Sequence, residues 1–299
     1  MHQQIFGVDI GGSKLICGIL TPEGEILQTW RADYAPGYSA DTLFDLIRRG
    51  FEKLNGNTCT VCGVAVPGLC DAGRGIWQYS PFSGISNIPV TEILHKMTGL
   101  PTYADNDVNL SAMAERYYGV CQGKDDFLWV TISNGIGGGL FLNGSLYRGA
   151  NLTAGEIGHI IVEPNGRICG CGNHGCLEAM ASGASISAIF RERTGQALST
   201  KEISLLAQGE NLEAMRVFEE AGSYIGTAAA HAVNLLGLDT VVLGGGVAES
   251  FSLLEPSATT ALRKNTFTKA NPTVKLLHSG LGKYAALTGC AALILNNKF

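Results

Sequence analysis

The hydrophobic and polar positions of the chain form short apolar runs separated by turn residues. The first run, residues 5–10, ends in a Gly-Gly-Ser turn, and a second apolar run follows at residues 15–20. A Thr-Pro-Glu-Gly-Glu sequence then leads into a third run at residues 26–31. Short apolar runs bounded by glycine and proline are typical of strands. The pattern therefore predicts an antiparallel meander of three strands.

Strand and helix patterns alternate after this meander. Apolar residues at helical spacing and short buried runs predict helices at 39–54, 91–98 and about 105–118, and strands at 60–66 and 101–104. The polar stretch 79–89, which glycine and proline interrupt, is expected to be a loop. This order predicts a sheet with helices on its faces, and ligands of such sheets bind at the carboxyl ends of strands, where Gly68 lies.

The second half of the chain repeats the pattern of the first. An apolar run at 127–133 ends in the glycine run 134–139, and a strand is expected at 140–142. Further helices are expected at 184–193, 199–208, 211–236 and 284–295, and strands at 239–243 and 274–277. Two strand, glycine-turn, strand units predict duplicated α/β domains that face each other across a cleft. We expect a small lobe of residues 1–118 plus about 285–299, and a larger lobe of residues 119–284.

A cysteine-rich stretch at residues 155–178 has the spacing of a metal site. Cys169, Cys171 and Cys176 form C-x-C-x4-C among glycines, and His159 supplies a fourth ligand. Because protein side chains fill all four positions, this set predicts a structural zinc. Glu156 and Glu178 flank the ligands and are able to accept hydrogen bonds from a neutral, hydroxylated substrate. The alternative is a loop that is rich in cysteine without binding metal.

The carboxylates and amides of residues 105–109, Asp-Asn-Asp-Val-Asn, stand between an expected strand and an expected helix. One interpretation is a helix N-cap, for which Asp and Asn are preferred. The functional interpretation makes Asp107 a general base and Asn106 an amide that positions a hydroxyl group.

Two glycine-rich turns are candidates for nucleotide contacts. The first follows Asp9, whose carboxylate is suited to a hydrated Mg²⁺, although a structural hairpin has the same sequence features. It is neither a P-loop nor a Rossmann fingerprint. The second, Gly244 to Gly246, allows close approach of a flat or phosphorylated ligand, and a tight turn is the alternative.

Composition narrows the class of protein. The 299 residues have 45% hydrophobic and 16% charged residues and a net charge of −5, without a Lys/Arg block. These values argue against nucleic acid and anionic membrane as partners. The N-terminal residues lack the features of a signal peptide, so a cytoplasmic location is expected. Nine cysteines then indicate thiols and a metal rather than disulfides, and Cys59 and Cys62 are expected to be strand residues without redox or metal chemistry.

Taken together, these motifs resemble the ROK family of sugar kinases and sugar-responsive repressors, in the actin and hexokinase superfamily. The resemblance spans nearly the whole chain: DIGGSK from Asp9, DNDVN from Asp105, NGIGGG from Asn134, GEIGH from Gly155, CGCGNHGCLE from Cys169 and VVLGGG from Val241. It implies a two-lobed actin/hexokinase-like (ribonuclease H-like) α/β fold with a structural zinc loop.

The resemblance also implies roles for individual residues. Asp107 takes the proton from a sugar hydroxyl, and His159 binds both zinc and sugar. The sugar-binding set is Gly68, Asn87, Asn106, Asp107, Glu156, His159 and Glu178. The nucleotide-binding set is Asp9, Gly11, Gly12, Ser13, Lys14, Asn134, Gly135, Gly137, Gly244, Gly245 and Gly246.

Two positions depart from the family pattern. Asn134 replaces a threonine in the second phosphate motif, which is expected to alter nucleotide contacts without abolishing activity. Phe82 stands where the family has a sugar-binding asparagine, and Asn87 is the candidate substitute. The loss of an amide puts plain glucose specificity in doubt and favours an epimer, an N-acetylated sugar or a glycoside.

The sequence therefore predicts a phosphotransferase with an alcohol acceptor. The expected reaction moves the γ-phosphoryl group of Mg-ATP to the 6-hydroxyl of a hexose such as glucose or allose. The alternatives are an N-acetylhexosamine kinase, a sugar-sensing repressor and a sugar-binding protein without catalysis. ROK repressors have a helix-turn-helix domain ahead of the kinase-like part, and the first strand here is expected from Ile5, which favours the kinase. Family kinases are commonly dimers, so a homodimer is expected.

Overall fold

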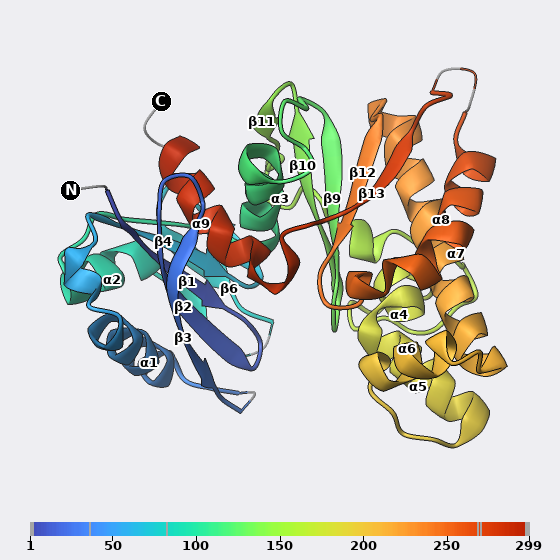
Figure 1. Ribbon diagram of the computed structural model, residues 1–299, viewed down its shortest axis with the longest axis horizontal. Coiled ribbons are helices and arrows are strands. Elements are labelled where there is room, and N and C mark those ends of the chain that lie inside the picture. Colours follow the sequence, from blue (N-terminus) through green and yellow to red (C-terminus); the bar gives the residue numbers. More distant parts are fainter. Residues whose placement is uncertain (1–2, 36, 82, 268, 270, 297–299) are drawn as a thin grey trace. The chain divides into compact units, whose positions relative to one another are not determined.

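The computed structural model describes residues 3–35, 37–81, 83–267, 269 and 271–296. Backbone contacts divide the chain into two compact units, each built from strands and helices (Figure 1). Unit 1 comprises Met1–Gly123, Arg148–Thr153 and Lys283–Phe299, and unit 2 comprises Lys124–Tyr147 and Ala154–Gly282. Arg148–Thr153 thus packs with unit 1, whereas the sequence-based division assigned these residues to the larger lobe.

The sheet of unit 1 has the strand order β3-β2-β1-β4-β8. Its strands are β1 (Ile5–Ile10), β2 (Lys14–Leu20), β3 (Ile26–Asp33), β4 (Val61–Val66) and β8 (Thr102–Asn106). The first three strands are antiparallel neighbours, and β4 and β8 run parallel to β1. The predicted meander is confirmed.

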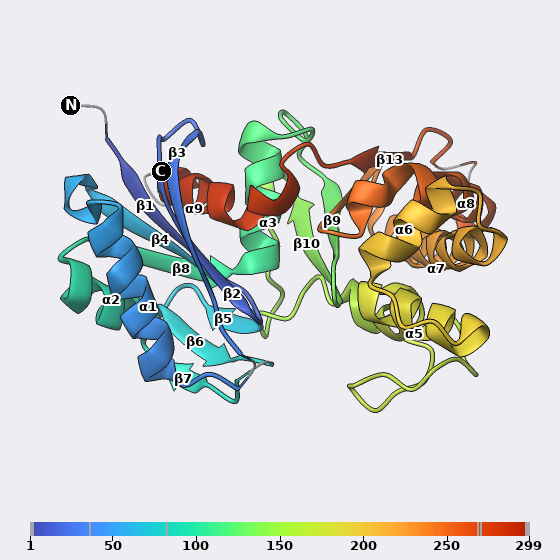
Figure 2. The same ribbon diagram turned by 60° about the horizontal axis from the view of Figure 1, so that its bottom comes forward.

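Helices cover both faces of this sheet because alternate side chains of each strand point to opposite sides. Phe6 packs in one buried cluster with Leu43 of α1 (Ala40–Lys53) and Leu94 of α2 (Val90–Thr98). Ile5, the preceding residue, packs in another cluster with Leu287 of α9 (Ala285–Asn296). Figures 1 and 2 show α9 beside α3 (Asp107–Tyr118), and contacts join these two helices.

The sheet of unit 2 has the order β11-β10-β9-β12-β13. Its strands are β9 (Phe127–Ile132), β10 (Ile136–Leu142), β11 (Ser145–Leu146), β12 (Thr240–Gly244) and β13 (Lys275–His278). Again three antiparallel neighbours precede two strands that run parallel to the first. The two sheets therefore have the same topology, and the predicted duplicated α/β fold class is confirmed.

The described residues of unit 2 also form five α-helices. They are α4 (Leu177–Ala181), α5 (Gly183–Thr194), α6 (Thr200–Gln208), α7 (Leu212–Leu236) and α8 (Phe251–Asn265). One buried apolar cluster joins residues of the sheet, such as Val130, to Phe190 of α5, Phe218 of α7 and Leu254 of α8. Within the described ranges, no helix combines the length and the hydrophobicity that crossing a lipid bilayer requires.

Two local predictions were wrong. The stretch 79–89 is not all loop, because β5 (Leu69–Asp71), β6 (Ile76–Tyr79) and β7 (Ser86–Ile88) form a small antiparallel sheet in unit 1. The second strand after the glycine run begins at Ile136 rather than Leu140, since β9 pairs with the glycines. A side chain on Gly138 would bring a Cβ within 2.6 Å of the Gly155 carbonyl oxygen, so glycine here permits a close backbone approach rather than a turn.

Candidate active site

The turn between β1 and β2 lies at the end of β1 that carries Asp9. The N–H group of Gly11 donates to the carbonyl oxygen of Lys14 at 2.8 Å and closes the turn. Loss of hydration raises the pKa of Asp9 to about 6, against the opposing effect of the Lys14 charge. Asp9 is therefore a carboxyl group that a cation would stabilise in its charged form.

Asn106 and Asp107 form the junction between β8 and α3. The Oδ1 atom of Asn106 accepts from the N–H groups of Val108 (2.8 Å) and Asn109 (3.0 Å), so Asn106 is the N-cap of α3. Its Nδ2 atom donates to the carbonyl oxygen of Gly68 at 2.8 Å and to Oδ1 of Asp107 at 3.1 Å. The capping role that the sequence left open thus belongs to Asn106, and its amide orients Asp107.

The environment of Asp107 favours its protonated form. Burial raises the pKa of Asp107 to about 7, and the negative charge of Asp9 adds to this effect. Hydrogen bonds from the N–H group of Val108 (3.0 Å) and from the Asn106 amide act in the opposite direction. A carboxyl group with a pKa near neutrality can exchange a proton readily at physiological pH.

Asp105, immediately before this pair, is fully buried and makes a different set of contacts. Its Oδ1 accepts from the N–H group of Asn106 (2.7 Å) and from Nδ2 of Asn109 (3.1 Å). Its Oδ2 accepts from Nε (3.1 Å) and Nη2 (2.5 Å) of Arg148. This ion pair joins Arg148 to a buried residue of unit 1, and the sequence motifs did not point to Arg148.

Gly68 and Asn87 are the other residues of unit 1 that were predicted to bind sugar. Gly68 has φ +82°, and a Cβ there would lie 2.3 Å from the Tyr79 carbonyl oxygen. Asn87 is exposed in β7 with φ +54°, and among the described residues it makes no hydrogen bond to Asn106 or Asp107. Phe82 lies outside the described residues.

In unit 2 the predicted zinc ligands come together. Four ligand atoms lie within 4.8 Å of one another, one from each of His159, Cys169, Cys171 and Cys176. Nδ1 of His159 is 3.7 Å from Sγ of Cys169, and Sγ of Cys171 is 3.7 Å from Sγ of Cys176. Tetrahedral zinc with bonds of about 2.3 Å to sulfur requires ligand atoms about 3.8 Å apart. The donor set and its spacing therefore fit this ion.

The two glutamates that flank the cysteine-rich loop differ in their contacts. Glu156 precedes the short 3₁₀ helix Ile157–His159, and its Oε2 lies 3.9 Å from Nε2 of His159. Glu178 lies in the first turn of α4, and its Oε2 accepts from the N–H group of Ile136 at 2.9 Å. Through this hydrogen bond, the end of the cysteine-rich stretch contacts the start of β10, next to the turn between β9 and β10.

That turn borders a cavity of about 510 Å³ within unit 2. Asn134 and Gly246, both predicted to contact nucleotide, line it, and the Gly246 N–H group donates to the Ser133 hydroxyl at 3.3 Å. The cavity also brings in polar residues that no sequence motif identified, namely Thr200, Lys201, Glu249 and Ser250. Gly135, Gly137, Gly244 and Gly245 are not among its lining residues.

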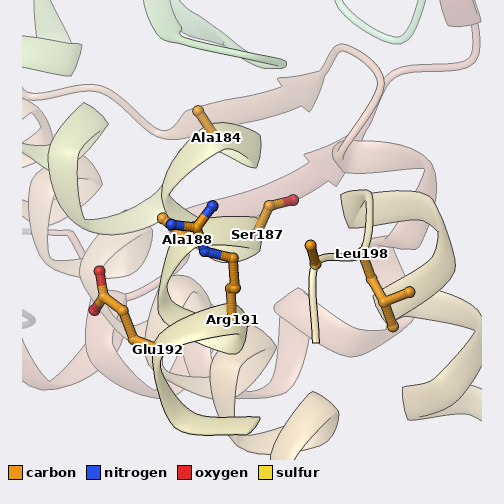
Figure 3. A pocket seen from close by; sticks show the side chains of 7 residues that line it. Ala184, Ser187, Ala188, Arg191, Glu192 and Leu198 are labelled. Atoms are coloured by element: carbon orange, nitrogen blue, oxygen red, sulfur yellow. The ribbon is translucent and has the colours of Figure 1, made fainter. Parts of the chain in front are cut away.

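A second cavity of about 460 Å³ lies along α5 (Figure 3). Ala184, Ser187, Ala188, Arg191 and Glu192 line it from one helix, and Leu198 faces them from the following loop. The hydroxyl groups of Ser187 and Thr200 are 3.0 Å apart, and each residue lines one of the two cavities. The regular helix pattern of α5 gave no sequence signal for this cavity.

The predicted site residues thus form two groups. Asp9, Gly11–Lys14, Gly68, Asn87, Asn106 and Asp107 belong to unit 1, and the remaining sugar, nucleotide and metal candidates belong to unit 2. Unit 1 holds the half-buried Asp9 and Asp107, and unit 2 holds the cluster of His159 with three cysteines and both described cavities.

This arrangement is that of a two-unit, ribonuclease H-like protein with a metal loop. The model of the ROK family matches residues 5–297, so the chain belongs to this family and the predicted resemblance is confirmed. Among curated proteins, the chain is similar to the glucokinase of Thermotoga maritima, with 30% identity over an alignment of 270 residues that covers 84% of this chain and 84% of that protein.

Solved structures in the same family include both kinases and regulators. A ROK family glucokinase from Streptomyces griseus, in complex with glucose and AMPPNP, has a TM-score of 0.87 and 28% identity, covering 97% of this chain and 98% of that one. A ROK family transcriptional regulator, a homologue of the Mlc protein of Escherichia coli, has a TM-score of 0.89 and 28% identity, covering 98% of this chain and 78% of that one.

Proposed function

We propose that this protein is an ATP-dependent sugar kinase that transfers the γ-phosphoryl group of Mg-ATP to the 6-hydroxyl of a hexose. The observation that carries the proposal is the state of Asp107, a half-buried carboxyl group whose pKa is raised to about 7 by loss of hydration at the junction of β8 and α3. The Asn106 amide orients it at the junction of β8 and α3. A general base works best when its pKa lies near the working pH.

Phosphoryl transfer depends on positioning and charge neutralisation more than on covalent chemistry. In this proposal Asp107 accepts the proton of the sugar 6-hydroxyl as that oxygen attacks the γ-phosphorus atom. Asp9 holds hydrated Mg²⁺ that accompanies ATP, and Gly11 to Lys14 provide backbone N–H groups for its phosphates. In unit 2, Asn134, Gly135, Gly137 and Gly244 to Gly246 bind the nucleotide.

The metal loop has a structural role in this proposal. His159, Cys169, Cys171 and Cys176 would hold zinc, and the bound ion would supply rigidity rather than Lewis acidity, since four protein ligands fill its coordination shell. Nδ1 of His159 belongs to the ligand cluster, so Nε2 and Glu156 remain free to hold sugar hydroxyls. Glu178 supports the same surface from α4.

The test is a sugar panel assayed with Mg-ATP by release of ADP. It contains glucose, allose, N-acetylglucosamine and N-acetylmannosamine, because Phe82 leaves the hexose class open. We expect turnover of at least one sugar, and Asp107→Ala should lower kcat by about 10²–10⁴-fold. Asp33→Asn, an exposed carboxyl at the end of β3, is the control and should retain full activity. Full activity in Asp107→Ala would refute the proposed base.

A sugar-responsive repressor is the second candidate, and the 0.89 TM-score with a ROK transcriptional regulator favours it. The two candidates differ in a simple experiment. A repressor binds a specific DNA duplex, and its affinity falls steeply as the salt concentration rises and changes when sugar is added. The proposed kinase binds no specific duplex. Sugar binding without any phosphorylation, together with sugar-sensitive DNA binding, would overturn the kinase proposal.

A further inference from the structure

Tyr34 follows β3 and lies within hydrogen-bonding distance of three carbonyl oxygens of the turn between β1 and β2. Its hydroxyl group has one proton to donate and lies within hydrogen-bonding distance of two carbonyl oxygens, that of Gly11 (2.6 Å) and that of Lys14 (3.0 Å). Its backbone N–H group donates to the carbonyl oxygen of Ser13 at 2.9 Å. One residue thus contacts the carbonyl groups of three of the four residues from Gly11 to Lys14. Tyr34 belongs to no motif of the sequence, and 20 residues separate it from Lys14.

These contacts give the turn a defined polarity. The carbonyl oxygens of Gly11, Ser13 and Lys14 are directed at Tyr34. The N–H groups of Gly12 and Ser13, in contrast, donate no hydrogen bond to any described residue. Ser13 is exposed and Gly12 is half-buried. Adjacent free N–H groups in a turn form a concave site for an anion. An anion binds there only while the carbonyl groups, which would repel it, face the other way.

The surroundings of Tyr34 keep its hydroxyl group in place as a donor. Its ring packs edge-on against Tyr38, with ring centroids 4.6 Å apart and an interplanar angle of 68°. Burial raises the pKa of Tyr34, and the Tyr38 hydroxyl and the Asp9 charge act in the same direction. The hydroxyl therefore stays protonated at physiological pH and donates continuously.

We infer that Tyr34 is a positioning residue for the nucleotide. It fixes the turn Gly11 to Lys14 so that the N–H groups of this turn stay open to a phosphate. The inference rests on the proposed function, because that function assigns the ATP phosphates to this turn. Tyr34 itself touches no substrate. Its hydroxyl group acts only through the backbone carbonyl groups of Gly11 and Lys14.

Tyr118 provides a matched control in the same unit. It is also a half-buried tyrosine with a raised pKa, and its hydroxyl donates to the carbonyl oxygen of Pro22 at 2.8 Å. Pro22 lies in the turn between β2 and β3. Tyr34→Phe and Tyr118→Phe therefore each remove hydroxyl contacts with a turn of one sheet, and both should lower the melting temperature to a similar small extent. Only the first variant alters the turn assigned to phosphate.

The experiment measures the Kd of Mg-AMPPNP by titration calorimetry and the KM values for Mg-ATP and sugar. Tyr34→Phe should raise the Kd and the KM of the nucleotide by about 5–10-fold, as expected for a weakened hydrogen-bonding site, with the sugar KM unchanged. Tyr118→Phe should change none of these values. A nucleotide Kd in Tyr34→Phe within twofold of the wild type, or an equal rise in both variants, would overturn the inference.

The outcome separates the inference from the proposed function. If the wild-type protein binds Mg-AMPPNP but phosphorylates no sugar, the proposed kinase fails, and the Kd ratio of the two variants still decides the role of Tyr34. If the wild-type protein binds no nucleotide, the inference and the proposed function both fail.

Discussion

The two hairpin turns of the duplicated sheets are held in different ways. In unit 1 the carbonyl groups of the β1–β2 turn accept from Tyr34, a residue that follows the third strand of the same sheet. In unit 2 the carbonyl oxygen of Ser133, in the β9–β10 turn, accepts from the N–H group of Gly183 at 2.7 Å, at the start of α5. One topology thus uses a side chain in the first case and a helix N-terminus in the second.

The strands that lead into these turns also differ. Asp9 precedes the last paired residue of β1, and Thr131 has the same place in β9. Each pairs with the neighbouring parallel strand, Asp9 with Ala65 and Thr131 with Gly244. The duplicated position is thus a carboxyl group in unit 1 and a neutral hydroxyl group beside glycine in unit 2. In the proposed mechanism, proton and cation chemistry therefore belongs to unit 1, and the metal loop belongs to unit 2.

Removal of the metal should have the largest effect on ligand binding, and the structural change that it causes should be confined to unit 2. Cys171→Ser removes one of four converging ligands, and even substitutions outside the ligand set lower metal affinity by about 10–100-fold in known sites. We expect loss of bound zinc and of measurable sugar affinity, with most of the fold retained because the loop is local. Metal analysis, calorimetry with the sugar and circular dichroism measure these changes.

His174→Ala is the control for this prediction. His174 lies in the same loop, is exposed and is not one of the cluster residues. It should keep its zinc and its sugar affinity. Stoichiometric zinc in Cys171→Ser would contradict the assignment of that ligand.

The buried ion pair of unit 1 should give the next largest effect. Arg148→Ala leaves the carboxylate of Asp105, whose side chain is only 1% exposed, without its cationic partner. Loss of one partner of a buried pair costs about 3–5 kcal/mol of the free energy of unfolding. Denaturant unfolding should show this loss.

Arg167→Ala tests the same kind of contact on the surface of unit 2. Arg167 pairs with Glu192, whose side chain is 57% exposed, at 2.7 Å. Solvent screens such a pair, so the expected cost is at most about 1 kcal/mol. If Arg148→Ala and Arg167→Ala lower the free energy of unfolding by the same amount, the ion pairs of the two units do not differ in their contribution to stability.

The pH dependence of activity should be set by two carboxyl groups of unit 1, those of Asp9 and Asp107. Asp107 must be deprotonated to act as a base, so kcat/KM should rise about tenfold per pH unit below pH 7 and level off above it. Because the negative charge of Asp9 helps to raise the pKa of Asp107, Asp9→Asn should move the inflection to lower pH. If the inflection stays at the same pH in Asp9→Asn, the charge of Asp9 does not influence the pKa of Asp107.

Stability should change with pH in the opposite sense. Folding raises the pKa of Asp9 and Asp107 from 3.8 to about 6 and about 7, so the folded state binds protons more tightly than the unfolded state in this range. Their joint contribution to the free energy of unfolding should therefore fall as the pH rises from about 4 to 7. Comparison of wild type with Asp107→Ala by denaturant unfolding at several pH values isolates the part that Asp107 contributes.

The smallest effect is expected at the turn of unit 2. Asn134→Thr restores the residue that the family has in this motif, and Asn134 lines the 510 Å³ cavity. One hydrogen bond exchanged for another should change the KM of Mg-ATP by no more than about fivefold, with kcat preserved. A loss of all activity would mean that Asn134 has a role that a hydroxyl group cannot replace.

Local pattern was sufficient for much of the fold. Apolar runs and glycine turns predicted the three-strand meander and its repetition, and the C-x-C-x4-C spacing predicted a cluster that the four side chains do form. It failed where distant pairing overrides a local signal. The glycines at 137–139 belong to β10 because β9 pairs with them, and β7 exists because β6 pairs with it.

The sequence by itself determined which residues are available for chemistry, because motif spacing and strand periodicity depend on near neighbours. The tertiary structure decided how these residues divide their work. It made Asn106 the cap and left Asp107 as a half-buried carboxyl group, since Gly68 meets the Asn106 amide from 38 residues away. It also brought Arg148 to Asp105 and Tyr34 to Gly11, across 43 and 23 residues. No local pattern encodes such pairs, because burial and hydrogen-bond partners depend on how the whole sheet and its helices pack.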